Sequence, residues 1–172
     1  MINQWIKYII TFVVLLLIQV LILNNLNLGG YINPYLYILF LLILPVAIPG
    51  WLLLILAFTL GLIIDAFQNT PGIHASATVF LAFMRPYFLR YIAPRDGYEP
   101  GSLPIPAHFG FLWFFKYAVF GVVSHHLFYF FVEAFTFKDI FATLWRVILS
   151  SIFTLLFIMI AQLFGQTKMR HN

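Results

Sequence analysis

The chain has 172 residues, of which 63% are hydrophobic and only 8% are charged, and its mean hydropathy is +1.01. A water-soluble domain carries about 25% charged residues, so this composition excludes one and predicts a single domain, residues 1–172, embedded in lipid. The chain contains no cysteine, which excludes disulfides, thiol catalysis and thiolate metal sites. The net charge of +4 comes from basic residues near the ends of apolar stretches, which is typical of membrane orientation rather than of nucleic-acid binding.

The apolar stretches predict an all-α polytopic membrane protein, a bundle of six transmembrane helices, because about 20 apolar residues cross a bilayer as a helix. The first stretch runs from Ile9 to Leu23, follows Lys7 and is interrupted only by Gln19. No small-residue cleavage site follows it, so we expect an uncleaved helix and not a signal peptide. This helix ends in an asparagine-rich polar turn, residues 24–33.

Residues 35–67 are too long for one span, at a rise of about 1.5 Å per residue. Pro45 and a Pro-Gly pair interrupt this region, so we expect a helical hairpin with arms over Tyr31 to Ile48 and Trp51 to Phe67. Both arms are short for a hydrocarbon core of about 30 Å, which leaves local thinning of the bilayer or a shallow turn as alternatives.

A polar turn ending in Pro71-Gly72 predicts the start of a fourth helix, Ile73 to Phe88, which finishes in an arginine cluster, Arg85 to Arg95. The segment from Tyr91 to Phe109 contains four prolines and two glycines, so we expect an irregular connecting loop there. A fifth helix over Phe111 to Phe135 and a sixth over Phe141 to Phe164 complete the predicted bundle.

Basic residues are divided unequally between the two sides of this six-helix topology. Seven lie on one side: Lys7, Arg85, Arg90, Arg95, Lys116, Lys168 and Arg170. Only Lys138 and Arg146 lie on the other. Because Lys and Arg accumulate in cytoplasmic loops, we expect both termini and the loop over residues 91–109 to face the cytoplasm.

Ionisable residues inside a membrane are costly, so each one is a candidate site residue. Gly61 and Asp65 lie one turn apart on the third helix, which places them on one face, packed against another helix with Asp65 near the outer surface. His74, which follows Pro71 and Gly72, is expected either to cap the fourth helix or to meet Asp65 across the turn.

Glu133 closes the fifth helix and Arg146 opens the sixth, so an ion pair between them is a natural way to neutralise both. A pair between Arg146 and Asp65 is the alternative. We expect these groups to hold the outer ends of the helices together, while a contact with a ligand or partner protein remains the other interpretation.

His125 and His126 are adjacent and diverge by about 100° on a helix, so they do not bind one metal ion from the same face. The pair of histidines four residues apart that a zinc helix uses is missing, and we expect each histidine to hydrogen-bond a neighbouring helix instead. The sequence has no nucleophile elbow and no phosphate-binding glycine loop. We therefore expect no catalytic residue, no metal site and no cofactor.

Two short motifs flank the predicted turn between the third and fourth helices. Gly61-Leu62-Ile63-Ile64-Asp65 ends one helix, and Pro71-Gly72-Ile73-His74-Ala75 opens the next, which basic residues then close. In these motifs, in length and in the order of its spans, the chain resembles the rod shape-determining protein MreD family. The loop over residues 91–109 is longer than in many members of that family.

The resemblance implies a non-catalytic component of the bacterial inner membrane that takes part in cell elongation and peptidoglycan synthesis. Its implied partners are MreC, MreB, RodA and a class B penicillin-binding transpeptidase. The implied fold is similar to the substrate-binding subunits of energy-coupling-factor transporters, and the implied mechanism is scaffolding of partner transmembrane helices. Candidate contact regions are the turn from Asp65 to His74 outside and the cluster from Arg85 to Arg95 inside, where membrane lipids compete for the arginines.

The alternative function is that of a substrate-binding subunit of a vitamin transporter. In that case a small molecule lies in an outward cavity lined by Asp65, His74, His125, Glu133 and Arg146. Such a subunit docks its coupling protein through small residues on its first helix, and the stretch from Ile9 to Leu23 has neither alanine nor glycine. This absence favours the scaffold.

Overall fold

A computed structural model of the chain describes residues 2–26, 29, 31–136 and 138–169, with side chains between residues 5 and 164 of these ranges. The regular structure of these residues is helical, without a β-strand. Four helices are long and apolar enough to cross a membrane: α1 (Ile2–Leu21), α3 (Gly50–Gln68), α6 (Phe111–Ala134) and α7 (Ile140–Met169). The chain is therefore an α-helical membrane protein.

Helix α4 (Ile73–Tyr91) is as long as α3 but less apolar, since it carries His74, Arg85 and Arg90 together with small polar residues. It packs between α3 and α6, and α6 packs in turn on α7. The buried polar side chains His74, Thr78 and Arg85 therefore face protein, where hydrogen-bond partners replace water, while Arg90 is exposed.

The second expected helix, residues 31–48, is not one continuous helix, and this prediction was wrong. The segment contains only a 3-10 turn, η2 (Leu36–Ile38), and a short helix, α2 (Leu39–Ile43). Proline explains the limits, because Pro34 and Pro45 push the residues before them away from helical geometry; Leu44 has a ψ of 151°.

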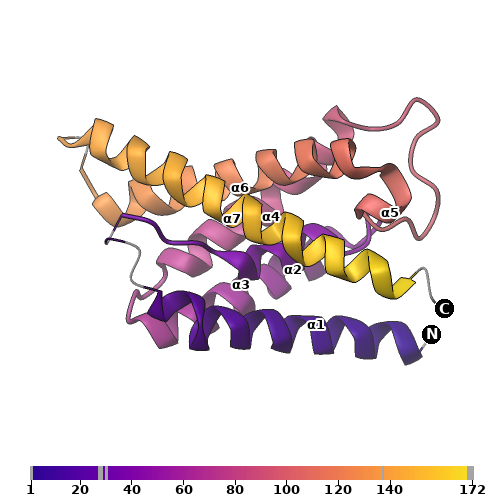
Figure 1. The fold of residues 1–172 in the computed structure, drawn as a ribbon, viewed down its shortest axis with the longest axis horizontal. Coiled ribbons are helices and arrows are strands. Elements are labelled where there is room, and N and C mark those ends of the chain that lie inside the picture. The colour runs from indigo at the N-terminus through magenta and orange to yellow at the C-terminus, as the bar shows by residue number, and fades with distance from the viewer. Residues whose placement is uncertain (1, 27–28, 30, 137, 170–172) are drawn as a thin grey trace.

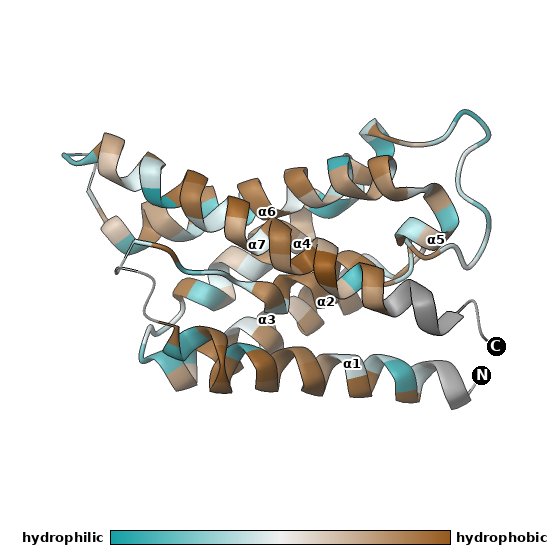
Figure 2. Cartoon of the chain, in the orientation of Figure 1, coloured by the Kyte–Doolittle hydropathy of each residue, from teal (hydrophilic) through white to brown (hydrophobic). Residues whose placement is uncertain are grey.

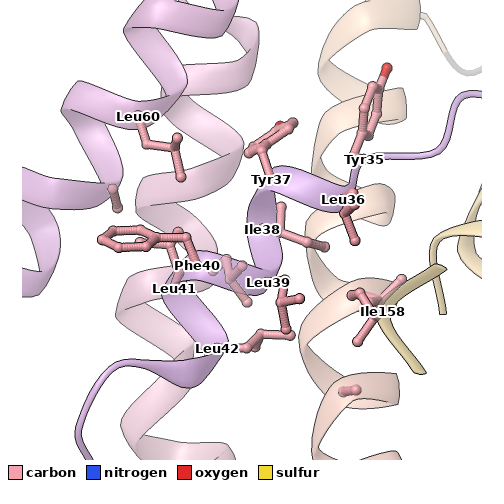
Figure 3. Packing of buried hydrophobic residues seen from close by; sticks show 14 of the residues in the cluster. Tyr35, Leu36, Tyr37, Ile38, Leu39, Phe40, Leu41, Leu42, Leu60 and Ile158 are labelled. Atoms are coloured by element: carbon pink, nitrogen blue, oxygen red, sulfur yellow. The ribbon is translucent and has the colours of Figure 1, made fainter. Parts of the chain in front are cut away.

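This segment is the most deeply buried part of the molecule. Residues 35–42 are all buried, and Tyr37, Ile38, Leu41 and Leu42 have no exposed surface. Figure 3 shows their side chains packed between the surrounding helices, with Leu60 on one side and Ile158 on the other. A continuous run of hydrophobic residues here reflects burial inside protein rather than contact with lipid.

The segment crosses the length of the bundle (Figure 1). Gln68 at the end of α3 hydrogen-bonds Asn24 just after α1, so these two helices end together, and residues 31–48 return from there to the start of α3. The beginning of α1, the loop over residues 91–109 and the end of α7 lie at the opposite end. Figure 2 shows hydrophobic residues along the helices and hydrophilic ones gathered in that loop.

Large apolar side chains cover the outside of the bundle. Trp5, Ile9 and Leu21 of α1 are more than 60% exposed, and only one narrow face of α1, with Leu15 and Gln19, is buried. Such a surface is stable in hydrocarbon and would aggregate in water, which agrees with the membrane environment that the composition predicts.

The loop over residues 91–109 is irregular apart from one turn of helix, α5 (Pro106–Phe109). Its Tyr98 hydroxyl donates a 2.6 Å hydrogen bond to the Leu89 carbonyl at the end of α4. Burial at this contact raises the pKa of Tyr98 to about 12, so the phenol stays protonated and able to donate. The Ser102 carbonyl accepts a hydrogen bond from the Val46 N–H, which ties the loop to the end of the buried segment.

Candidate functional site

Polar side chains from the surrounding helices bind the backbone of residues 31–48. An irregular segment leaves backbone N–H and C=O groups without helical partners, and lipid offers no hydrogen bonds. Side chains therefore have to bind these groups. Gln19 of α1 meets both needs at once. Its Nε2 donates to the Pro34 carbonyl at 3.0 Å, and its Oε1 accepts from the Tyr37 N–H at 3.3 Å.

Two hydroxyl groups of α7 bind the same part of the segment. Ser150 Oγ accepts from the Asn33 N–H, and Thr154 Oγ1 accepts from the Tyr35 N–H, both at 3.0 Å. Ser150 and Thr154 are fully buried and lie one helical turn apart, so a single stripe of α7 faces the segment.

The other end of the segment is bound by Arg85 of α4 and Tyr117 of α6. Arg85 Nη2 donates to the carbonyls of Leu44 and Pro45, and its Nε donates to Tyr117 Oη at 2.8 Å. The Tyr117 hydroxyl donates onward to the Leu42 carbonyl at 3.1 Å. A guanidinium has five donors and no acceptor, so it suits this group of carbonyl oxygens.

The sequence predicts Arg85, with Arg90 and Arg95, in a cytoplasmic cluster that contacts a partner or lipid headgroups, and for Arg85 this prediction was wrong. Arg85 is 1% exposed, whereas Arg90 and Arg95 are exposed. The interruption of residues 31–48 is the physical reason, because it creates free carbonyls inside the bundle that a buried cation can bind.

The Tyr37 hydroxyl lies between two histidines, 2.8 Å from His74 Nδ1 and 3.0 Å from His125 Nε2. His74 Nε2 lies 3.0 Å from Gln68 Oε1, which only accepts, so in a neutral ring Nε2 donates and Nδ1 accepts the Tyr37 proton. Tyr37 Oη then accepts from His125 Nε2, and Gln68 Nε2 donates to Asn24 Oδ1 at 2.7 Å. One chain of hydrogen bonds thus runs from α6 to the end of α1.

His125 stands at the inner end of this chain. Its Nδ1 is buried and, among the residues that the structure describes, has no hydrogen-bond partner. The neighbouring His126 points elsewhere: its Nδ1 donates to the Val122 carbonyl at 2.8 Å, and its Nε2 accepts from Thr154 at 3.1 Å. The expected divergence of the two rings and their bonds to neighbouring elements are confirmed.

Asp65 caps the N-terminus of α4. Its carboxylate accepts from the backbone N–H groups of His74 at 3.0 Å and Ala75 at 2.9 Å, and from the Thr70 hydroxyl at 2.9 Å. Negative charge is favourable at this end of a helix, where the first N–H groups have no helical acceptor. Of the two alternatives predicted for His74, the meeting with Asp65 across the turn is found, through the His74 backbone N–H, while its ring binds Tyr37 and Gln68. The alternative pair between Asp65 and Arg146 is not formed; Arg146 binds Glu133.

Gly61 lies where α3 crosses α4 at close range. A Cβ atom on Gly61 would lie 2.4 Å from both the Ala75 Cα and the Thr78 hydroxyl, too close for any side chain. Thr78 Oγ1 also donates to the Ala57 carbonyl of α3 at 2.8 Å. Pro71 and Gly72 form the intervening turn, with Gly72 at a φ of +85° that favours glycine.

Glu133 and Arg146 form the predicted ion pair, with Oε2 and Nη1 2.8 Å apart. Their side chains are 29% and 26% exposed, so the pair lies at the edge of the bundle. Arg146 also stacks over the Phe130 ring at 4.6 Å, and Tyr129 donates to Glu133 Oε1 at 3.4 Å. These contacts join the end of α6 to the start of α7.

Several residues of the network are not predicted from the sequence, among them Gln19, Tyr37 and Tyr117. Gln19 stands out only as an interruption of an apolar stretch, and no sequence pattern singles out Tyr37 or Tyr117. A lone amide in an otherwise uncharged span is the one signal that points to a partner, since an unsatisfied amide in hydrocarbon costs several kcal/mol.

The polar side chains of the network bind mainly one another and the backbone. Within the described residues no group of three or more His, Asp or Glu side chains is arranged to hold a metal ion. Most of the polar groups are engaged in hydrogen bonds to the chain itself, which defines a helical membrane protein whose buried polar residues hold an irregular segment in place. Comparison with family models, with curated proteins and with solved structures gives no match for the chain.

Proposed function

We propose that the protein is a non-catalytic scaffold of the bacterial inner membrane, part of the cell-elongation complex that synthesises peptidoglycan in rod-shaped cells. In this proposal the chain crosses the membrane six times, with residues 31–48 as an irregular crossing, and both termini are cytoplasmic. The bundle, similar to that of energy-coupling-factor substrate-binding subunits, holds transmembrane helices of partners such as MreC and RodA.

The use of the polar residues is the observation that carries this proposal. A transporter subunit needs polar side chains free to bind a substrate in an outward cavity. Here Asp65 is occupied by backbone N–H groups of α4, and His74 by Tyr37 and Gln68. Glu133 and Arg146 bind each other. Groups engaged in this way support a structural role over substrate binding.

The two motifs on which the resemblance depends, residues 61–65 and 71–75, have structural roles in this bundle. Gly61 permits the close crossing of α3 and α4, and Asp65 caps α4 across the turn. The motifs therefore fix the angle between α3 and α4. A scaffold that binds partner helices needs such a fixed arrangement of its own helices.

An apolar groove of about 600 Å³ supports a role in holding partner helices. It lies between α1, residues 44–49 and α3, and its lining includes Trp5, Tyr8, Phe12, Phe40 and Leu56. Association of helices in lipid depends on shape and close packing, so a furrow of this kind suits a transmembrane helix better than a flat surface does.

Photo-crosslinking in native membranes tests the proposal. A crosslinking amino acid is placed at Ile9, Ile55 or Ile152, on three different helices, each more than half exposed. We expect at least one of these positions to capture a membrane protein of wall synthesis. The buried Leu15, 7% exposed, is the matched control and should capture no partner.

Depletion of the protein provides the second readout. We expect rod-shaped cells to round or swell as the wall-synthesis complex disperses. Capture of an ATP-binding transport module, together with normal cell shape and vitamin-dependent growth, would show that the transporter assignment is correct and the scaffold wrong.

A further inference from the structure

A surface groove lies where the end of α4 meets the start of α6. Its volume is about 870 Å³, within the range of small-molecule sites. Apart from one lysine its walls are apolar and aromatic, and they include Tyr91, Ile92, Leu112, Trp113, Lys116 and Phe120. Figure 1 shows both helix ends beside the loop over residues 91–109, at the end of the molecule where α1 begins.

Contacts within the protein fix the walls of this groove. Trp113 Nε1 donates to the Ile92 carbonyl at 2.8 Å, which joins α6 to the end of α4. The rings of Tyr91 and Phe120 meet edge to face, with centroids 5.7 Å apart. A groove with walls held in this way is preorganised, so an occupant does not have to order it.

Lys116 is a free cation in this groove. Its side chain is exposed, and no ion pair or hydrogen bond joins it to another residue that the structure describes. The acidic residues of the adjacent loop, Asp96 and Glu99, line a separate cavity with His108. The lining thus complements an amphiphile with an apolar body and a negative head.

Lys116 lies near the start of α6, a helix long enough to cross a membrane, and we place it at the boundary between headgroups and hydrocarbon. It lies five residues after Phe111, the first residue of α6, which is about 8 Å along the helix axis. A headgroup layer is about 5–8 Å thick on each side of the hydrocarbon core. A lysine at this boundary extends its ammonium toward the phosphates while its stem stays against apolar surface.

We propose that this groove is a binding site for an anionic glycerophospholipid, with its phosphate on the Lys116 ammonium and an acyl chain against Trp113 and Phe120. A partner helix is the other candidate occupant of an apolar groove. The unpaired cation at its polar end favours a lipid headgroup. The inference depends on the membrane environment of the chain and not on its role as a scaffold.

Quenching of Trp113 fluorescence by brominated lipids tests the proposal directly. Trp5, Trp51 and Trp145 are each more than half exposed, so their replacement by phenylalanine leaves Trp113 as the single reporter. The full chain is reconstituted with brominated phosphatidylglycerol or brominated phosphatidylcholine. We expect the anionic lipid to bind beside Trp113 roughly fivefold more tightly, the preference that one basic residue near a membrane surface provides.

One lysine and one arginine substitution distinguish lipid binding in this groove from a general effect of surface charge. Lys116→Gln is expected to abolish the preference for phosphatidylglycerol. Arg90→Gln removes one charge from the same end of the bundle but lines a different groove, between α3 and α4, and should leave the preference intact. Equal binding of both lipids by the parent protein, or equal losses in the two variants, would overturn the proposal.

Discussion

Ser150→Ala tests whether a single buried hydroxyl helps to hold the irregular segment. This substitution removes the acceptor of the Asn33 N–H and leaves the rest of α7 unchanged. The next residue supplies a matched control, since Ser151 is also buried but its hydroxyl has no hydrogen-bond partner among the described residues. Ser151→Ala therefore removes an equal volume without stranding a backbone group.

The expected loss of stability in Ser150→Ala follows from the Asn33 N–H, which is left without an acceptor. A buried N–H without an acceptor costs about 1–3 kcal/mol in a water-soluble protein. Hydrogen bonds between membrane helices contribute less, about 0.6 kcal/mol on average and about 1.7 kcal/mol at most. Asn33 is half-buried near the end of the bundle, so we expect about 1 kcal/mol for Ser150→Ala and less than about 0.5 kcal/mol for Ser151→Ala.

Thr154→Val amplifies the effect, because it strands both the Tyr35 N–H and His126 Nε2 while it preserves the shape of the side chain. We expect this variant to lower the free energy of unfolding by about 2 kcal/mol. Unfolding of the purified protein by increasing mole fractions of dodecyl sulfate, followed by tryptophan fluorescence and circular dichroism, measures these differences. Equal stability of the Ser150 and Ser151 variants would refute the assignment of these hydroxyls.

Three further experiments test the contacts between the helices. Gly61→Ala should lower the free energy of unfolding by about 1–3 kcal/mol, because its Cβ would overlap α4. Gly50→Ala, with open space at its Cβ, is the control and should leave the unfolding midpoint almost unchanged. Similar midpoints for the two variants would contradict the close crossing of α3 and α4. Asp65→Ala should lower the folded amount in membranes by more than Asp65→Asn, which keeps one acceptor oxygen for α4, and equal amounts would count against the cap. A double-mutant cycle of Glu133→Gln and Arg146→Met should give a coupling energy below about 1 kcal/mol, since the pair is partly exposed, and a value well above this would mean that the pair is buried in the membrane-embedded protein.

The membrane class and several polar contacts of this protein can be predicted from its sequence. Composition alone defines the lipid environment, and helical spacing brings Gly61 and Asp65 onto one face. The Glu133–Arg146 pair follows from two charges that flank a short turn. These predictions succeed because they depend on residues close together in the chain.

The irregular segment could not be predicted in the same way. Hydropathy is equally high for a helix in lipid and for an irregular segment buried among helices. Which of the two forms depends on partners that lie far away in the sequence, such as Ser150, which is 117 positions from Asn33. The position of Arg85 has the same origin, because a cation near a predicted helix end reads as interfacial until the free carbonyls of Leu44 and Pro45 are known.

Cysteine labelling tests most directly whether residues 31–48 cross the membrane as an irregular, buried segment. The chain has no native cysteine, so single cysteines at Tyr31 and Ala47, two exposed positions that bracket the buried part, report on its two ends. We expect a membrane-impermeant maleimide to reach Tyr31→Cys and Ala47→Cys from opposite sides, with Lys7→Cys on the side of Ala47. Labelling of both bracket positions from one side would contradict the crossing and, with it, the role assigned to the polar network.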